Sequence, residues 1–297
     1  MIAQKPSTSK QLTKHVPKLL TYVVLSLGAT AMILPFIWML STSVKVDSEI
    51  FSDTIQWLPR QFDFKNYVDA YQQTNMGRLF LNTGFVTFVS VASQVILGAM
   101  AGYAFARLHF RGKNILFFSL LATMMVPFEV LIIPIFLFVR AFPLAGGNNI
   151  LGQGGTGLFN TYAGLIFPNL ISVFSIFLFR QFYLRFPHEI EEAAIVDGCS
   201  RVGVFWRILL PNSRPVIATM ALFAFLWSWN DFLWPLVVVR SDSLNTLQLG
   251  LSLFNQEQGT QWAELMAAST MAVIPVVILY LLLQRFLTKG AVTSGID

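Results

Sequence analysis

Residues 191–211 read EEAAIVDGCSRVGVFWRILLP, a polar segment inside a chain that is otherwise strongly apolar. The segment holds three acids and two arginines, whereas 55% of the 297 residues are hydrophobic and only 12% are charged. A soluble domain usually carries about 25% charged residues. The composition therefore indicates a membrane protein, and a segment of this kind belongs to a loop outside the bilayer.

Six apolar stretches flank this loop, each long enough to cross a bilayer, which takes about 20 residues of helix. The glycine-rich stretch Gly146–Gly157 is too polar to span, and it is expected to form the loop before the fourth helix. We predict an all-α integral membrane protein with six transmembrane helices, at about residues 19–41, 81–105, 114–139, 160–180, 215–238 and 265–285.

Lys and Arg residues are unevenly shared between the two sides of these helices. Fourteen fall on the side of both termini and six on the other. Because cytoplasmic loops carry the excess of positive charge, both termini and residues 191–211 are predicted to be cytoplasmic. We expect tails at 1–18, with 1–16 disordered, and at 291–297. Between them lies a six-helix domain at 19–290, whose first helix is retained, with only a short outer cap at about 42–80.

Local signals predict two short helices in the loop at 181–214. Pro187 suits a first helical position, Gly198 a left-handed helix end, and Ser200 the cap of a second helix. Pro211 should end that second helix. Its apolar face, lying against the membrane surface, would consist of Val202, Phe205, Trp206 and Leu209.

The first of these helices has the composition of a docking surface. Ala193 and Ala194 would let another protein approach closely, while Glu191, Glu192 and Asp197 offer acids to partner arginines or backbone donors. An ordinary solvated loop explains the same residues equally well, so on the residues alone both interpretations stay open.

The spacing of the loop resembles a known signature. Glu192-Ala193-Ala194, three residues, Gly198, nine residues, Ile208, one residue and Leu210-Pro211 resemble the EAA motif of ATP-binding cassette (ABC) importer permeases. Further stretches are similar to the sugar-importing, maltose-permease type, and the resemblance covers about residues 80–290. These stretches are MVPFEVLIIP at 125–134, WSWNDFLWPL at 227–236, and the run 245–290.

This resemblance implies a type I ABC importer (MetI-like) transmembrane domain with its core at 80–285, in the bacterial inner membrane. The implied partners are a second permease subunit, two ATPase subunits that bind ATP and Mg²⁺, and an extracytoplasmic solute-binding protein. Glu192 would pair with an ATPase, and closure of the ATPases would drive alternating access for an oligosaccharide or a related polyol or glycerol phosphodiester. The implied coupling residues are Glu191, Glu192, Ala193, Ala194, Asp197, Gly198, Ile208, Leu210 and Pro211.

Two acids lie inside predicted spans, where a charge costs on the order of 2.5–3.5 kcal/mol at the bilayer centre. Straight helices would bring Glu129 and Asp231 to a similar depth, about 22 Å and 25 Å above their inner ends. Either the acids line a solute path or they lie near the outer interface and join subunits. We favour the second role for Glu129 and leave both open for Asp231. Further candidates for lining the path are Trp227, Ser228 and Asn230, with Trp229 and Trp234 close by.

Other features of the helices concern packing and catalysis. Gly98 and Gly102 should permit close helix packing, and Pro127, Pro134 and Pro235 should kink or open their helices. The sequence lacks a phosphate-binding G-x-x-x-x-G-K-[ST] loop, and its histidines and single cysteine lack metal-site spacing, so we predict neither an enzyme nor a cofactor. The basic pI of 9.4 requires no nucleic acid. The alternative function is a proton-coupled transporter or channel that uses Glu129 and Asp231. The histidines and the cysteine that lack metal-site spacing are His15, His109, His188 and Cys199, and Cys199 is predicted to be a packing residue.

Overall fold

A computed structural model of the protein describes residues 8–52, 54–256 and 259–292. The chain forms two compact units. The first unit runs to Tyr71 and also includes Phe254–Met271, and the second comprises Gln72–Leu253 and the chain from Ala272 onward.

Almost all of the regular secondary structure in the described residues is helical, with one two-stranded antiparallel ribbon as an addition to the predicted all-α fold. Elements before α4 and after α14 are α1 (Thr8–Thr42), α2 (Asp47–Ile50), α3 (Lys65–Gln73), η4 (Ser252–Phe254), β1 (Asn255–Gln256), β2 (Gly259–Thr260) and α15 (Trp262–Val292). The rest are α4 (Met76–Arg107), α5 (Lys113–Thr123), α6 (Phe128–Arg140), α7 (Tyr162–Ile166), η1 (Phe167–Asn169), α8 (Val173–Arg185), α9 (His188–Val196), α10 (Arg201–Val204), the π-helix η2 (Phe205–Leu209), α11 (Leu210–Asn212), α12 (Arg214–Trp229), α13 (Leu233–Val238), η3 (Asp242–Leu244) and α14 (Leu247–Leu251).

Up to six spans result, which confirms the predicted class. Three helices are each long and apolar enough to cross a membrane, at Leu20–Thr42, Met76–Arg107 and Trp262–Phe286. Three further spans are bent pairs rather than straight rods. The pairs are Lys113–Thr123 with Phe128–Arg140 (103°), Tyr162–Asn169 with Val173–Arg185 (42°), and Arg201–Asn212 with Arg214–Trp229 (76°).

Proline residues explain two of the breaks that the straight-helix prediction missed. Pro127 caps α6 with an extended backbone and disfavours a helical conformation at the residue before it, so the predicted helix 114–139 divides there. Pro235 has no N–H to bond the Asp231 carbonyl, and the predicted helix 215–238 is interrupted after Trp229. Pro134, in contrast, lies inside a continuous α6.

The amino-terminal prediction also needs correction. Helix α1 begins at Thr8, so residues 8–18 are helical and do not form the expected disordered tail. The helix of the first span continues toward the terminus through Pro17, although this residue lacks the N–H for one helical hydrogen bond. Residues 1–7 and 293–297, the remaining parts of the predicted tails, lie outside the described residues.

The first unit contains the predicted short cap, built around a buried lysine. Lys45 is 1% exposed, its ammonium donates to the carbonyl of Gln56, and it lies 4.3 Å from the ring centre of Trp38. Asn66 Nδ2 donates to the carbonyls of Ser43 and Lys45 at 3.1 and 2.8 Å. Burial lowers the pKa of Lys45, and the charge of Glu49 partly opposes that lowering.

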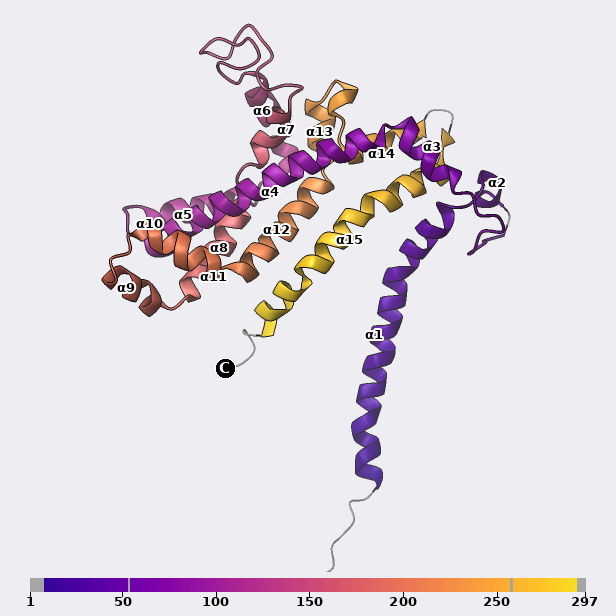
Figure 1. The fold of residues 1–297 in the computed structure, drawn as a ribbon, viewed down its shortest axis with the longest axis horizontal. Coiled ribbons are helices and arrows are strands. Elements are labelled where there is room, and N and C mark those ends of the chain that lie inside the picture. Colours follow the sequence, from indigo (N-terminus) through magenta and orange to yellow (C-terminus); the bar gives the residue numbers. More distant parts are fainter. Residues whose placement is uncertain (1–7, 53, 257–258, 293–297) are drawn as a thin grey trace, which may run out of the picture. The chain divides into compact units, whose positions relative to one another are not determined.

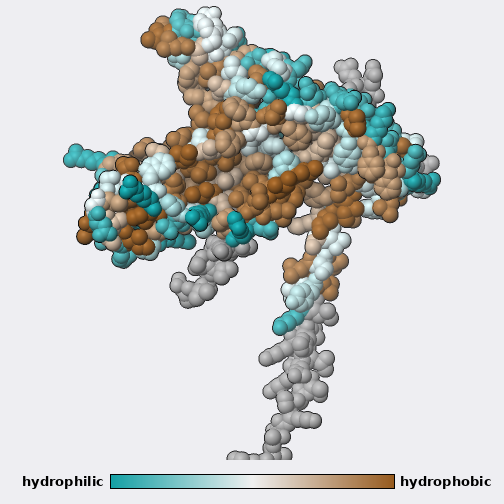
Figure 2. Space-filling model, in the orientation of Figure 1, coloured by the Kyte–Doolittle hydropathy of each residue, from teal (hydrophilic) through white to brown (hydrophobic). Residues whose placement is uncertain are grey.

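Close helix packing organises the second unit, in which α4 runs beside α8 and α12 (Figure 1). A Cβ added at Gly98 would lie 1.8 Å from Ser175 Oγ, and one at Gly102 would lie 2.6 Å from Phe179 Cβ. Only glycine therefore allows α4 and α8 to approach so closely, which confirms the packing role predicted for the pair. Apolar side chains also gather on the outer surface of these helices (brown in Figure 2), as contact with lipid tails requires.

Candidate functional site

The loop at 186–200 contains a nine-residue helix, α9 (His188–Val196), with acids in its first turn. Glu189 and Glu191 lie there, where negative charge suits the helix dipole. Pro187 occupies the cap before the helix and not the predicted first helical position. The correction is small, because a residue without an N–H costs nothing at either place.

Gly198 ends α9 as predicted. Its φ is +86°, its N–H bonds the carbonyl of Ile195 at 3.0 Å, and the N–H of Cys199 bonds the carbonyl of Ala194 at 2.9 Å. This pair of bonds is the Schellman arrangement, which favours glycine at the left-handed residue. Ser200 then caps the next helix by accepting the N–H of Gly203 at 3.1 Å, which confirms that prediction too.

The second helix of the loop differs from the predicted amphipathic rod. Phe205 and Leu209 are buried in the protein core with Phe179 and Tyr183, whereas Val202 and Trp206 are exposed. The helix has a π-turn over Phe205–Leu209, which shifts side chains away from the 3.6-residue stripe. It also continues to Asn212, past Pro211, so Pro211 does not end it.

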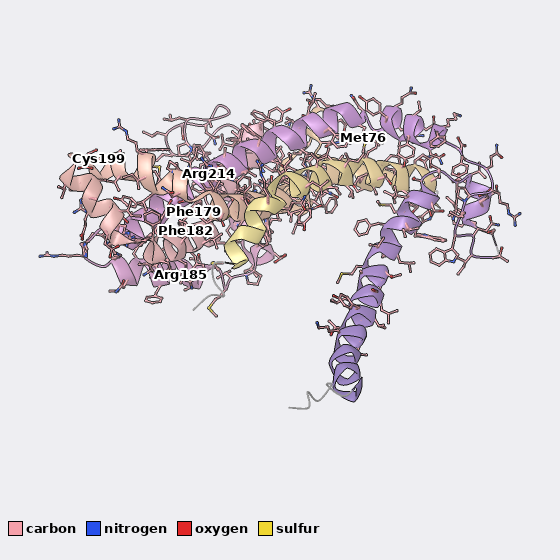
Figure 3. All side chains as sticks on the ribbon, turned by 60° about the horizontal axis from the view of Figure 1, so that its bottom comes forward. Met76, Phe179, Phe182, Arg185, Cys199 and Arg214 are labelled. Atoms are coloured by element: carbon pink, nitrogen blue, oxygen red, sulfur yellow. The ribbon has the colours of Figure 1, made fainter. Side chains whose placement is uncertain are left out.

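Side chains around this second helix fix the loop to the second unit. Ile208, Leu210 and Cys199 are half-buried against the core that contains Phe179, so Cys199 has the predicted packing role. Figure 3 shows Cys199 at the turn that leads into α10 and Phe179 on α8 of the same unit. The loop is therefore a packed part of the fold.

The surface of α9 divides into two faces. Glu192, Ala193 and Asp197 are exposed, and so is Val196, of which 86% is open to solvent. Ala194 and Glu191, in contrast, are buried. Burial of Glu191 contradicts its predicted role as an anchor for a partner, because its carboxylate is occupied inside the protein.

Arg107, the last residue of α4, occupies that carboxylate. Its Nε lies 2.6 Å from Glu191 Oε1, as an ion pair that lacks hydrogen-bond alignment, and both side chains are buried. Nη2 donates to the carbonyl of Phe186 at 2.5 Å, and Nη1 contacts His188 Nε2. In the sequence, Arg107 contributed only to the count of positive charges that predicts orientation. The signal for its structural role was its position directly after the apolar run of α4.

Glu129 lies apart from this loop, in the first turn of α6, and it is exposed. The 103° bend between α5 and α6 makes the depth derived from a straight helix wrong. Asp231 lies just beyond the uninterrupted α12, where Oδ1 accepts the N–H of Trp234 at 3.3 Å. The structure therefore gives the two acids different surroundings.

Residues beside Asp231 are divided between open and packed positions. Trp227 is 66% exposed, and Asn230 is exposed with its amide oxygen 3.3 Å from Gln248 Nε2. Ser228 is buried and shares a hydrogen bond of 3.1 Å with Thr87 of α4, so its hydroxyl is not open to a solute. Of the predicted group, Trp227 and Asn230 have accessible side chains.

Trp229 and Trp234, which lie close to these candidates in the sequence, do not offer a surface to a solute. Both are buried, with their Nε1 atoms donating to the carbonyls of Ala272 and Gly164 at 3.1 Å each. Indole groups satisfied in this way serve helix packing. Among the residues that the structure describes, no three His, Cys, Asp or Glu side chains gather as a metal site requires.

Comparison with known proteins extends this description. Residues 94–292 match the family model described as "Binding-protein-dependent transport system inner membrane component". The chain is 32% identical to an arabinooligosaccharides transport system permease protein of Halalkalibacterium halodurans, over 89% of this chain and 91% of that protein. It is 30% identical to a lactose transport system permease protein of Rhizobium radiobacter, over 95% and 98%.

A third relative and a solved structure agree with these two. The diacetylchitobiose uptake system permease protein of Streptomyces coelicolor is 31% identical, over 93% of this chain and 87% of that protein. The fold matches a chain in the crystal structure of a bacterial ABC transporter involved in the import of the acidic polysaccharide alginate. The TM-score is 0.78 at 23% identity, over 95% of this chain and 99% of that chain.

Proposed function

We propose that a cytoplasmic ATPase binds to α9 and drives the movement of this chain through it, because the chain belongs to the family of binding-protein-dependent transport system inner membrane components. The chain is a multi-pass inner-membrane permease subunit of an ABC uptake system for carbohydrates, and it is not itself catalytic. ATP hydrolysis and solute capture in such a system come from an ATPase and a binding protein.

The proposal also includes the partner subunits and the side of the membrane on which the termini lie. One copy of this chain pairs with a second permease subunit, two ATPase subunits bind to the cytoplasmic loops, and both termini are cytoplasmic. The excess of Lys and Arg on the side of the termini supports this orientation. The exposed face of α9 then lies in the cytoplasm, within reach of an ATPase.

The observation that carries the docking proposal is the composition of this exposed face. Val196 and Ile195 are apolar and exposed, and small Ala193 beside the acid Glu192 lets a partner approach closely. An apolar patch with the exposed acids Glu192 and Asp197 at its edges fits a groove that has a cationic rim. The Schellman end at Gly198 holds the patch on a rigid helix, so force applied there reaches the core through Ala194 and Cys199.

Co-purification of the ATPase tests docking directly. The Val196→Arg variant should lose the ATPase from the detergent-solubilised complex, since a cation replaces the most exposed apolar side chain of α9. Glu192→Gln should weaken retention, and Glu189→Gln supplies the matched control because it removes another exposed acid, near the start of the helix. Full retention of the ATPase by Val196→Arg would refute the proposed surface.

The proposed substrate is a short oligosaccharide. The named relatives are permeases for arabinooligosaccharides, lactose and diacetylchitobiose, which supports a sugar over a glycerol phosphodiester. The exposed indole of Trp227 and the exposed amide of Asn230 supply stacking and hydrogen bonding for such a ligand. Uptake assays with the complete transporter and a panel of disaccharides and trisaccharides test the class, and transport confined to non-carbohydrates would contradict it.

A further inference from the structure

Arg107 terminates α4, the 32-residue helix at the centre of the second unit. At 1.5 Å per residue the helix is about 48 Å long, enough to cross the bilayer. Gly98 and Gly102, within the last three turns of α4, permit its close approach to α8. The end of α4 is therefore a firmly packed point beside the loop that bears α9.

Three contacts join Arg107 to that loop. The guanidinium reaches the carbonyl of Phe186, the ring of His188 and the carboxylate of Glu191. These three groups lie before, at the beginning of and within the first turn of α9. Because arginine has only donors, His188 Nε2 is the acceptor in its contact with Arg107. One planar group therefore fixes both the start and the direction of the helix.

Burial distinguishes this contact from a surface ion pair. Arg107 is 6% exposed and Glu191 is 7% exposed, so the charges are poorly screened and each depends on the other. A second link lies nearby, where the hydroxyl of Tyr103 donates to the carbonyl of Arg201 at 3.4 Å. The last turns of α4 thus contact the loop on both sides of Gly198.

We infer that Arg107 is a positioning residue that transmits movement of α9 directly to α4, so that the two helices move as one body during transport. The chain itself connects α9 only to α8 and, through α10 and η2, to α12. Without Arg107, α9 would keep its connection to α8 and its packing through Ala194, but its start would lose the polar contacts with the end of α4. This inference rests on the proposed function, in which α9 receives the force of the ATPase.

The test measures sugar molecules taken up per ATP hydrolysed, in proteoliposomes that contain the complete transporter. Arg107→Met alone leaves the Glu191 carboxylate buried without a partner, and that variant can fail to fold. The double variant Arg107→Met/Glu191→Leu removes both charges at similar volume, which keeps the core apolar and filled. Arg111→Met is the matched control, because it removes an exposed arginine on the turn that follows α4.

The double variant should keep the ATPase bound and hydrolyse ATP, but transport at least tenfold less sugar per ATP. Arg107→Lys, which keeps the charge without the planar fork, should fall between it and the unchanged protein. An unchanged ratio of sugar transported to ATP hydrolysed would overturn the inference. A proportional fall of hydrolysis and uptake, as destabilisation of the protein produces, would leave this ratio unchanged and count against the inference in the same way. Failure of the docking proposal is recognised separately, because Val196→Arg would then retain the ATPase.

Discussion

Gly102→Ala should push α4 and α8 apart in a region where neither helix has room to adjust. The added methyl would lie 2.6 Å from Phe179 Cβ and 2.9 Å from the backbone nitrogen of Arg180. Because non-bonded carbons are best placed about 3.5–4.0 Å apart, α8 must retreat by roughly 1 Å. Overpacking of this size costs about 1–3 kcal/mol.

Gly84→Ala provides the matched control, since it lies on the same helix with no atom within 4 Å of the added methyl. Both variants gain the helix propensity of alanine, about 1 kcal/mol, so their difference isolates the clash. The free energy of unfolding in mixed detergent–SDS micelles should be about 1–3 kcal/mol lower for Gly102→Ala than for Gly84→Ala. Equal values for the two variants would refute the close packing of α4 on α8.

Three further perturbations have defined outcomes. Gly198→Pro should leave the subunit inserted but abolish solute uptake per ATP hydrolysed, because proline cannot adopt a φ of +86° and has no N–H to donate to the carbonyl of Ile195. Gly198→Asn, which tolerates a left-handed backbone, should transport normally. Normal uptake by the proline variant would contradict the role of the turn. Asn230→Leu should raise the sugar concentration needed for half-maximal uptake at an unchanged amount of assembled complex, and an unchanged transport curve would remove Asn230 from the solute path. Burial lowers the pKa of Lys45 in the folded protein. Between that lowered pKa and the ordinary lysine value of about 10.4, the unfolded state therefore binds more protons than the folded state. The free energy of unfolding should rise with pH across this window. Lys45→Met should lack that rise in pH-dependent unfolding, and an identical pH profile in both proteins would argue against a buried ammonium.

Local patterns predicted the features that depend on neighbouring residues. Gly198 and Ser200 could be identified as helix ends because capping depends on a few adjacent backbone groups and one side chain. Gly98 and Gly102 could be identified as a packing site because their spacing places them on one helix face. The partner surface on α8, with Ser175 and Phe179, could not be read from α4 alone.

Features that combine distant parts of the chain escaped the same reasoning. Glu191 and Glu192 are adjacent and chemically identical, yet one is buried against Arg107 and the other is exposed. Their difference depends on where α4 ends relative to α9, 84 positions along the chain from Arg107 to Glu191. Ser228, Trp229 and Trp234 likewise resembled solute-binding residues until their hydrogen bonds to Thr87, Ala272 and Gly164 placed them in the packing.

Hydropathy, charge and helix-end residues alone predicted a six-span membrane protein with a structured loop between two spans, because transfer to lipid and capping act on short segments. Tertiary packing decided which side of α9 faces outward, where three of the spans bend, and that Arg107 ties the loop to α4. Those outcomes depend on the pairing of charges and donors from separate helices. A buried polar group pairs with whichever partner the fold brings within hydrogen-bond distance, and the sequence pattern does not show which residues come that close.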